Sequence, residues 1–281
     1  MKIVMKLGGS VVTFKDVDYF PSSWKEIKET CKEYIRTNNI KRIAKELKRI
    51  VSDGEIELIL INGAGPFGHF LVREMLNGNK NVTPELVHKS VELLNKKIVE
   101  TFEKCSIHLV SLAPSDFCSF NDGKIDSSKL FEKCTEILKN NKYPSTYGDG
   151  VRTDKVVSPL GNLAVISGDD LVIELAKLWE PDKIIVATDV DGVFTSDPKV
   201  HPDAKLLRVV TPQMFDQIVF DRTKVDVTGG MRSKVLKLFK VANIAECRIV
   251  NGFKENVIKY AIEGKEVGTL IKVDQHQNSQ Q

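Results

Sequence analysis

The sequence predicts an α/β protein, built as a three-layer αβα sandwich around a mainly parallel central sheet. Two observations predict this class. Residues 56–61 form an almost continuous apolar run, which is typical of a parallel strand that helices cover on both faces. Similar short runs alternate along the 281 residues with longer segments whose apolar residues recur at helical spacing. Repeated strand–helix alternation produces such a sheet. The length would allow one large domain or two small ones, and because the sequence shows no internal repeat and no clear linker, we expect one domain over residues 1–273.

In the first half of the chain, strands and helices follow one another in this alternating order. Apolar residues mark one face of the lysine-rich helix expected at 24–52, and Thr37-Asn38-Asn39 predicts a break within it. Pro84 opens a long helix, because proline is favoured at the first helical position. We expect the buried stripe of this helix to reach Cys105. A further helix is expected at 128–139, and strands are expected at 1–7, 56–61, 107–112 and 143–147.

Two β-hairpins are also expected. Asn121-Asp122-Gly123-Lys124 lies between Phe117–Phe120 and Ile125, and an Asp-Gly pair between apolar residues is a strong turn signal. Residues 151–157 and 160–167 form the second candidate, across Ser158-Pro159. Both hairpins predict local antiparallel pairing within an otherwise parallel fold.

The second half of the chain continues the alternation. A helix is expected from Asp169 to Trp179 and ends before Pro181, because proline cannot continue a helix. Residues 189–194 predict a turn, and 197–202 predict a loop. The remaining expectations are helices after 228–230 and at 254–262, strands at 183–188, 247–250 and 268–273, and a disordered polar tail at 274–281.

Composition argues against several classes of function. The formal net charge of +3 is too small to indicate a nucleic-acid partner. Five scattered cysteines, an odd number without a CxxC pair, argue against a disulfide framework and a zinc site. We also expect no residue of the chain to be a metal ligand. No apolar run approaches the ~20 residues that span a bilayer. Met1 leads directly into a strand, and we expect no signal peptide, no membrane partner and a cytoplasmic location.

Glycines follow two of the expected strands. In Lys6-Leu7-Gly8-Gly9-Ser10, paired glycines would let backbone N–H groups approach a phosphate, and Lys6 adds positive charge. Asn62-Gly63-Ala64-Gly65-Pro66-Phe67-Gly68-His69 ends the second strand and opens a helix. It matches neither a P-loop nor a dinucleotide fingerprint, yet a strand, glycines and a helix start together form an anion site. The alternatives are an ordinary turn at Gly8-Gly9 and a structural role for His69.

Three further motifs lie in the second half. Ser167-Gly168-Asp169-Asp170 begins a helix, where an aspartate could act as a plain N-cap or could orient lysines. Thr188-Asp189-Val190-Asp191-Gly192-Val193-Phe194 could be a polar connection after a strand. Thr228-Gly229-Gly230 leads into a helix that carries Lys234 one turn later, which again combines a helix N-terminus with an ammonium group. Ligands of parallel sheets bind at the carboxyl ends of the strands, where the glycine clusters fall.

The order of these five motifs resembles the amino acid kinase superfamily, and the resemblance covers the chain from Lys6 to Ile271. Within it, the histidine of Gly65-Pro66-Phe67-Gly68-His69 and the element Tyr147-Gly148-Asp149 resemble the archaeal type of isopentenyl phosphate kinases. The resemblance implies the amino acid kinase fold and the use of ATP and Mg²⁺ to phosphorylate isopentenyl phosphate in isoprenoid biosynthesis. It also implies a homodimer through the N-terminal half. Fosfomycin kinases share much of this pattern, so a kinase of another phosphate or phosphonate is the alternative.

The resemblance also implies roles for individual residues, with the acceptor site in the N-terminal half and the nucleotide site in the C-terminal half. Magnesium would bridge ATP oxygens with few protein ligands. The implied catalytic residues are Lys6, Lys15, His69, Asp169 and Lys234. The implied ATP-binding residues are Lys6, Gly8, Gly9, Ser10, Gly65, Asp189, Gly230 and Lys234. The implied substrate-binding residues are Ala64, Gly65, Gly68, His69 and Gly148.

Three features depart from the family pattern. Pro66 stands where serine is usual, which removes one N–H from the acceptor loop, and Ala64 stands at a position that is often glycine. The lysine-rich segment 24–49 is also longer than in the family pattern. A non-catalytic nucleotide sensor on this fold is a third hypothesis, but it would not need Lys6, Lys234 and His69 together. An isoprenoid tail would need an apolar wall, and candidates that core packing would also explain are Phe70, Leu71, Val72 and Met75.

Overall fold

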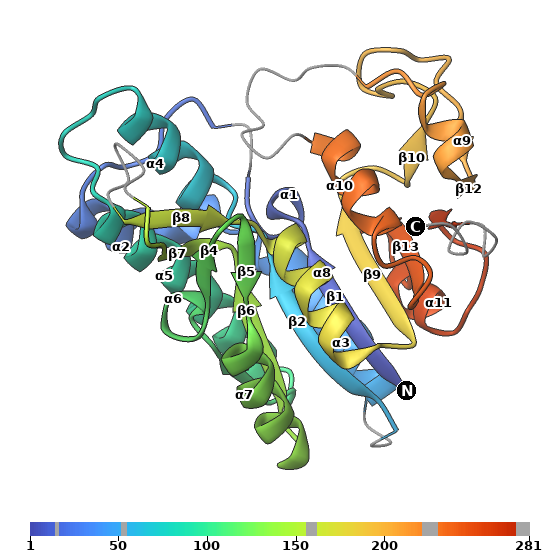
Figure 1. The fold of residues 1–281 in the computed structure, drawn as a ribbon, viewed down its shortest axis with the longest axis horizontal. Helices are drawn as coiled ribbons and strands as arrows, with labels where there is room; N and C mark the ends of the chain where they lie inside the picture. The colour runs from blue at the N-terminus through green and yellow to red at the C-terminus, as the bar shows by residue number, and fades with distance from the viewer. Residues whose placement is uncertain (15–16, 52–54, 156–161, 221–229, 274–281) are drawn as a thin grey trace.

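The computed structural model describes residues 1–14, 17–51, 55–155, 162–220 and 230–273, and its centre is an eight-stranded sheet (Figure 1). Every strand pairing in this sheet is parallel except that of β13 with β14. The α/β class with a mainly parallel sheet is therefore confirmed. In sheet order, the strands are β12 (Val209–Val210), β14 (Thr269–Ile271), β13 (Glu246–Asn251), β9 (Lys183–Thr188), β1 (Lys2–Leu7), β2 (Glu57–Asn62), β6 (Tyr143–Tyr147) and β3 (Leu109–Ser111).

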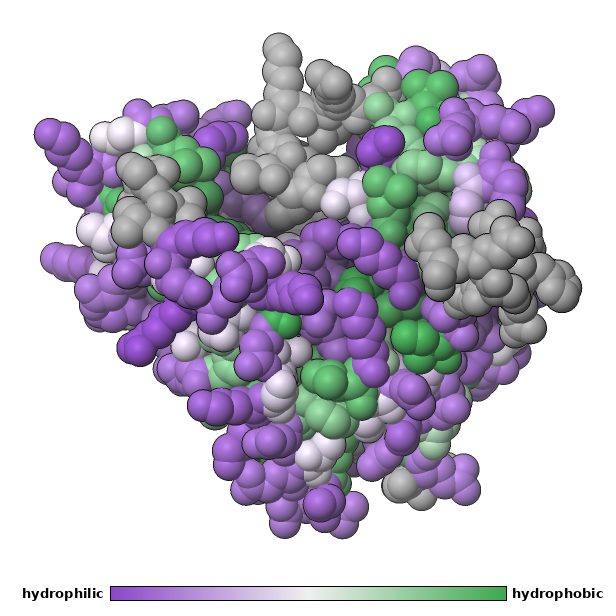
Figure 2. Space-filling model, viewed as in Figure 1, coloured by the Kyte–Doolittle hydropathy of each residue, from purple (hydrophilic) through white to green (hydrophobic). Residues whose placement is uncertain are grey.

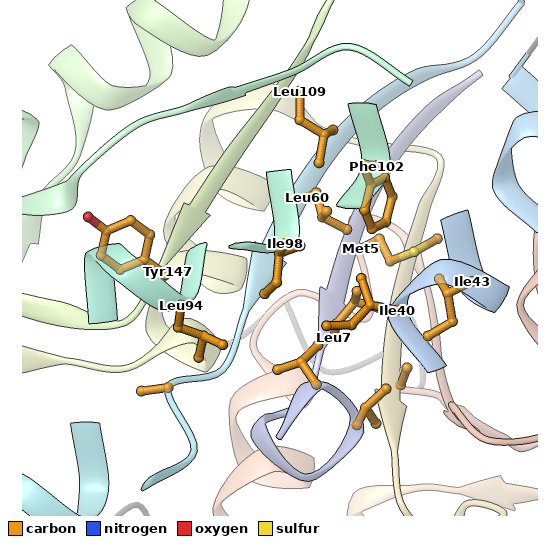
Figure 3. Packing of buried hydrophobic residues seen from close by; sticks show 14 of the residues in the cluster. Met5, Leu7, Ile40, Ile43, Leu60, Leu94, Ile98, Phe102, Leu109 and Tyr147 are labelled. Atoms are coloured by element: carbon orange, nitrogen blue, oxygen red, sulfur yellow. The ribbon is translucent and has the colours of Figure 1, made fainter. Parts of the chain in front are cut away.

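The central strands are apolar on both faces, and alternate residues enter two separate hydrophobic clusters. Along β1, Met5 and Leu7 belong to one cluster and Val4 to the other. Side chains of successive strand residues point to opposite faces, so a strand covered on both sides needs apolar residues throughout. Figure 3 shows the first cluster, where Met5 and Leu7 lie among residues of neighbouring helices.

Helices cover both faces of the sheet, and Figure 1 shows α8 in front of β1 and β2. The first cluster takes buried residues from α1 (Gly9–Val12), α2 (Trp24–Tyr34), α3 (Thr37–Val51), α4 (Pro66–Leu76), α5 (Pro84–Glu103) and α11 (Val257–Ile262). The second takes them from α7 (Ser128–Lys139), α8 (Gly168–Trp179), α9 (Pro212–Phe215) and α10 (Gly230–Phe239), with Phe117 of α6 (Pro114–Phe117) packed against it.

The lysine-rich segment is two helices, as its predicted break requires. The break lies at Ile35 and Arg36, directly before Thr37, where Ile35 has extended backbone angles and forms an isolated bridge with Thr13. Helix α3 buries Ile40 and Ile43 against the sheet while most of its lysines are exposed. This segment is therefore an amphipathic layer of the fold.

Both predicted hairpins form, in a second sheet of four strands beside the main one. Strand β4 (Ser119–Asn121) pairs antiparallel with β5 (Lys124–Asp126). Strand β7 (Asp149–Arg152) pairs antiparallel with β8 (Leu163–Ile166) and bridges to β4. The β7 and β8 strands are shorter than expected, and residues 156–161 lie outside the described part of the chain.

Several local expectations were wrong or incomplete. The expected turn at 189–194 contains β10 (Val193–Phe194), which pairs with β11 (Leu206–Leu207). Helix α5 ends at Glu103, so Cys105 lies beyond it. Helix α11 begins three residues later than expected, because Asn256 before it has a left-handed backbone. Lys15, the Thr228-Gly229 pair and the tail 274–281 lie outside the described residues.

Apolar side chains concentrate inside the molecule. Hydrophilic residues cover most of the face seen in Figure 2, with smaller hydrophobic areas between them. Among the helices that the structure describes, none combines the length and the apolar character that crossing a membrane requires.

Candidate active site

A cavity of about 1320 Å³ lies at the carboxyl ends of β1, β2 and β9. This is the edge of a parallel sheet where ligands bind, because loops and helix N-termini meet there. The structure brings every predicted site residue that it describes to this cavity, whereas Lys15 lies outside the described residues. The predicted residues that line it are Lys6, Gly8, Gly9, Ser10, Ala64, Gly65, Gly68, His69, Gly148, Asp169, Asp189, Gly230 and Lys234.

The two glycine-rich loops pack directly against one another. A Cβ on Gly9 would lie 2.8 Å from the backbone nitrogen of Gly65, which is closer than real Cβ contacts allow. Gly65 also has a φ of +52°, in the left-handed region that glycine tolerates best. Backbone hydrogen bonds hold the loops, because the Gly63 N–H donates to Leu7 O at 2.8 Å. The loops predicted to contact donor and acceptor are therefore adjacent at one point of the cavity.

Two lysines share one carboxylate at the centre of the cavity. Lys6 Nζ on β1 lies 2.6 Å from Asp169 Oδ1. Lys234 Nζ on α10 lies 3.1 Å from Asp169 Oδ2 and 3.2 Å from Oδ1. These side chains are only 7% to 13% exposed, so the group is shielded from bulk water. Two ammonium groups and one carboxylate leave a net positive charge at the meeting point of three distant chain segments.

Burial and mutual repulsion set the charge state of this cluster. Burial is the main cause that lowers the pKa of Lys6 to about 8, and the positive charge of Lys234 lowers it further against the attraction of Asp169. Burial alone would raise the pKa of Asp169, but Lys234 and Lys6 together hold it well below its usual range. Asp169 is therefore ionised near neutral pH, and Lys6 keeps its proton there with little margin.

Two roles were considered for the Ser167–Asp170 motif, namely capping the helix and orienting lysines, and each of its two aspartates has one of them. Asp170 completes a capping box, because its Oδ2 accepts from the Ser167 N–H at 2.9 Å while Ser167 Oγ accepts from the Asp170 N–H at 3.2 Å. Asp169 takes no part in the cap and contacts the two lysines instead. The cap fixes the first turn of α8 and hence the direction of Asp169.

Helix α4 places His69 at the cavity, one turn from the glycines of the second loop. Pro66 occupies the first helical position, where a backbone N–H has no partner within the helix. The substitution of proline for the usual serine is therefore compatible with the helix start. The His69 N–H donates to Gly65 O at 2.9 Å, and its side chain is half-buried.

The opposite part of the cavity lies beyond β9. Asp189 follows this strand and forms an ion pair with Lys199, and both residues line the cavity. Gly230 begins α10 at the same cavity, with Lys234 one turn further on. Asp191 instead pairs with Lys254 at 2.7 Å and does not line the cavity.

A family model described as "Amino acid kinase family" matches residues 1–251. This chain belongs to the amino acid kinase family. The matched range contains the Lys6–Asp169–Lys234 cluster and both glycine-rich loops.

Among its relatives, the chain is similar to enzymes named isopentenyl phosphate kinase. It is 33% identical to that of Methanothermobacter thermautotrophicus, over 96% of this chain and 98% of the relative. It is 31% identical to that of Methanocaldococcus jannaschii, with the same coverage. A structure titled "X-ray structures of isopentenyl phosphate kinase" is 29% identical, covers 97% of this chain and 100% of its own, and has a TM-score of 0.73.

Two polar groups of this amino acid kinase were not found from the sequence. His88 Nδ1 lies 2.8 Å from Asp149 Oδ2, and Asp149 is fully buried. This hydrogen bond is the main cause that raises the pKa of His88. In the second group, Asn95 of α5 donates to Asn62 Oδ1 at 2.8 Å, directly before the second glycine loop. No signal in the sequence links these residues, since 61 and 33 positions separate the partners.

One part of the cavity wall is apolar. Val72 and Met75, two of the four suggested wall residues, line it, whereas Leu71 is fully buried in the core and Phe70 packs against Phe20. Strand β8 was not expected to contribute to this wall. Its antiparallel pairing with β7 brings it to the cavity, whose lining comes from segments far apart in the sequence. The other apolar residues of this wall include Leu76, Val87, Val91, Leu163 and Val165.

Proposed function

We propose that this protein transfers the γ-phosphoryl group of ATP to isopentenyl phosphate, forming isopentenyl diphosphate and ADP. The observation that carries the proposal is the buried Lys6–Asp169–Lys234 cluster beside two packed glycine loops. The relatives named isopentenyl phosphate kinase support the choice of acceptor, since they align over nearly the whole chain. We further propose that residues 1–273 form one domain and that the protein is a cytoplasmic homodimer through its N-terminal half.

The reaction needs electrostatic help more than acid–base chemistry. A phosphate monoester has its second pKa near ~6, so the attacking oxygen is already ionised at neutral pH. That oxygen forms a bond to the γ-phosphorus, while the bond from the γ-phosphorus to the β–γ bridging oxygen breaks and ADP leaves with the electron pair. No proton has to be removed. The barrier arises because an anion approaches an anionic triphosphate, so positive groups must surround the transferred group.

Lys6 and Lys234 supply this positive charge in the proposed mechanism. Asp169 holds both ammonium groups within 3.2 Å of its carboxylate, so neither has to be ordered when substrates bind. The shared carboxylate also balances part of the charge in the absence of ligand. Asp169 therefore orients the lysines without contacting the transferred group itself.

The acceptor would lie at the second glycine loop. Backbone groups of Ala64, Gly65 and Gly68 and the imidazole of His69 would bind its phosphate, and Gly148 would contact the substrate nearby. The apolar wall formed by α4, α5 and β8 adjoins this loop and would accommodate a five-carbon chain. A phosphate at one end and an apolar group at the other match the two parts of isopentenyl phosphate.

ATP would lie on the other side of Lys6. Gly8, Gly9 and Ser10 would approach its phosphates, and Asp189 and Gly230 line the part of the cavity where the rest of the nucleotide would fit. Lys15 would lie near the same phosphates. The Asp169, Asp170 and Asp189 carboxylates each contact a lysine, and the described residues contain no group of three or more metal-ligating side chains. In this proposal, ATP oxygens would hold the magnesium ion, with few protein ligands.

The test is an ADP-release assay with ATP and Mg²⁺ and four separate acceptors. These are isopentenyl phosphate, dimethylallyl phosphate, fosfomycin and UMP. We expect turnover with the isoprenoid phosphates, and an Asp169→Asn variant purified in parallel controls for contaminating kinases. Robust turnover of fosfomycin or UMP, with none of either isoprenoid phosphate, would reject the proposed acceptor.

A further inference from the structure

A second lysine–aspartate pair joins α10 to α8 beside the first. Lys237 Nζ lies 2.7 Å from Asp170 Oδ1 and donates to Ser167 Oγ at 3.1 Å. Both charged side chains are mostly buried, at 23% and 29% exposed, and both line the cavity. Lys237 lies outside the motifs that the sequence offered, and it has no role in the proposed mechanism.

The two lysine–aspartate pairs follow the same order along α10 and α8. Lys237 follows Lys234 by one helical turn on α10, and Asp170 follows Asp169 on α8. Two polar contacts one turn apart on α10 restrain sliding and rotation of this helix more than one such contact does. The α8 side of this second contact is itself rigid, because Ser167 and Asp170 form the capping box.

We propose that Lys237 is a positioning residue, which with Asp170 and Ser167 holds α10 so that Lys234 reaches Asp169 and the transferred phosphoryl group. This inference rests on the proposed phosphoryl transfer. Asp170 Oδ1 and Ser167 Oγ both engage the Lys237 ammonium group, and in this proposal Lys237 acts on the reaction through Lys234.

The charge state of the pair agrees with this role. Burial alone would raise the pKa of Asp170, but hydrogen bonds from Lys237 and Ser167 hold it below its usual value. Asp170 is therefore ionised near neutral pH, and a partly buried ionic contact depends strongly on geometry. Lys237 also adds to the positive charge that lowers the pKa of Lys6.

The test compares Lys237→Met, Asp170→Asn and the double variant in single-turnover phosphoryl transfer. Methionine keeps an unbranched apolar stem, and asparagine keeps an oxygen that can accept from the Ser167 N–H. We expect each single variant to slow transfer by roughly 10- to 100-fold, since a displacement of about 1 Å at a reacting group costs this much. The double variant should be no slower than the slower single variant, because both remove the same contact.

Three controls separate positioning from other roles. Lys237→Arg should recover most of the rate, because it keeps the charge. Lys240→Met changes an exposed lysine three residues further along and should leave the rate unchanged. The KM values for ATP and acceptor should stay within about twofold in every variant, since the contact does not touch either substrate in this proposal.

Hydrogen exchange of the α10 amides supplies a readout that does not depend on the acceptor. Lys237→Met should speed exchange of the α10 amides beyond the first turn, where the N–H groups have acceptors within the helix, whereas Lys240→Met should not. If the rate and the exchange are both unchanged, Lys237 has no positioning role. If the KM for ATP rises while single-turnover transfer at saturation is normal, Lys237 binds the nucleotide and the inference is wrong. If α10 responds as expected but no isoprenoid phosphate is turned over, the proposed acceptor fails and the helix contact stands.

Discussion

Lys6 and Lys234 contact the same carboxylate from opposite halves of the chain, although 228 positions of sequence (234 − 6) separate them. Asp169 lies between them at the start of α8 and holds both ammonium groups in the cavity. Two buried cations this close would repel each other strongly without the carboxylate. The relationship leads directly to the first prediction.

Asp169→Asn should abolish most phosphoryl transfer. The variant leaves two buried ammonium groups without a counterion, so we expect a loss of roughly 100-fold or more in single-turnover rate. The free energy of unfolding should also fall, by roughly 3–5 kcal/mol at most, because one partner of a buried ion cluster is gone. Denaturant unfolding and rapid-quench kinetics measure the two effects.

The matched control for this substitution is Asp182→Asn. Asp182 accepts from the Lys2 N–H at the opposite end of the sheet and is exposed. It should change neither the transfer rate nor the binding of ATP. Transfer by Asp169→Asn within threefold of the unchanged protein would contradict the proposed role of the carboxylate.

The rate should fall at alkaline pH as Lys6 loses its proton. Its pKa is lowered to about 8, and only the protonated form carries the charge that the transfer needs. The value of kcat/KM should therefore be high between about pH 6 and about pH 8 and decline above that range, because this ratio reports ionisation of the free enzyme and the free acceptor. In Asp169→Asn, the alkaline loss of any residual activity should begin at a lower pH than in the unchanged protein, since Asp169 raises the pKa of Lys6. A profile that stays flat to about pH 9.5 would show that the Lys6 proton is not required.

His69→Ala should impair the acceptor half of the reaction selectively. The backbone hydrogen bond from residue 69 to Gly65 O is kept in alanine, so the helix start should survive. We expect a loss of about 100-fold in kcat/KM for the acceptor and nearly unchanged ATP affinity, as measured by calorimetry. His108→Ala is the control, because His108 is 64% exposed and pairs with Glu103 away from the cavity. Weak ATP binding with a normal acceptor KM would place His69 in the nucleotide half of the site and contradict its proposed role in acceptor binding.

Asn95→Leu should affect both stability and acceptor binding. Asn95 is fully buried and donates to Asn62 Oδ1 and Ser145 Oγ, while Ser111 Oγ donates to its oxygen at 2.6 Å. Leucine leaves these groups without their partner, so the free energy of unfolding should fall by roughly 2–4 kcal/mol. The KM for the acceptor should rise as well, because Asn62 leads into the second glycine loop.

Ser111→Ala supplies a graded comparison for the same network. It removes one hydrogen bond and should cost only about 1 kcal/mol of unfolding free energy. If Asn95→Leu changes stability without changing the acceptor KM, the network supports the fold and does not position the loop.

Much of the fold could be predicted from local sequence patterns. The apolar run at 56–61 and the helical stripe with Ile40 and Ile43 are properties of a few neighbouring residues, and the corresponding elements formed. Proline at positions 66 and 84 begins helices for a reason that is also local. The expectations at Cys105 and at the start of α11 were wrong by a few residues, since weak local signals define helix ends poorly.

The candidate site was predicted less completely. The order of the motifs indicated the family, and the cavity collects every described residue that the resemblance named. His88 with Asp149, Asn62 with Asn95, and Lys237 with Asp170 were all missed, because each pair joins segments far apart in the chain. The catalytic and binding roles of the predicted residues stay predictions until the variants are measured.

By itself, the sequence determined the class of fold, the family and the residues that end the strands at the cavity. These features follow from local periodicity, from the torsional freedom of glycine and from the order of short motifs. Only the tertiary structure decided which charges meet. The parallel register of β1 with β2 and β9 brings Lys6 beside the second glycine loop, and α8 and α10 add Asp169 and Lys234. Coulomb energies and burial depend on distance in space, and local sequence patterns do not encode that distance.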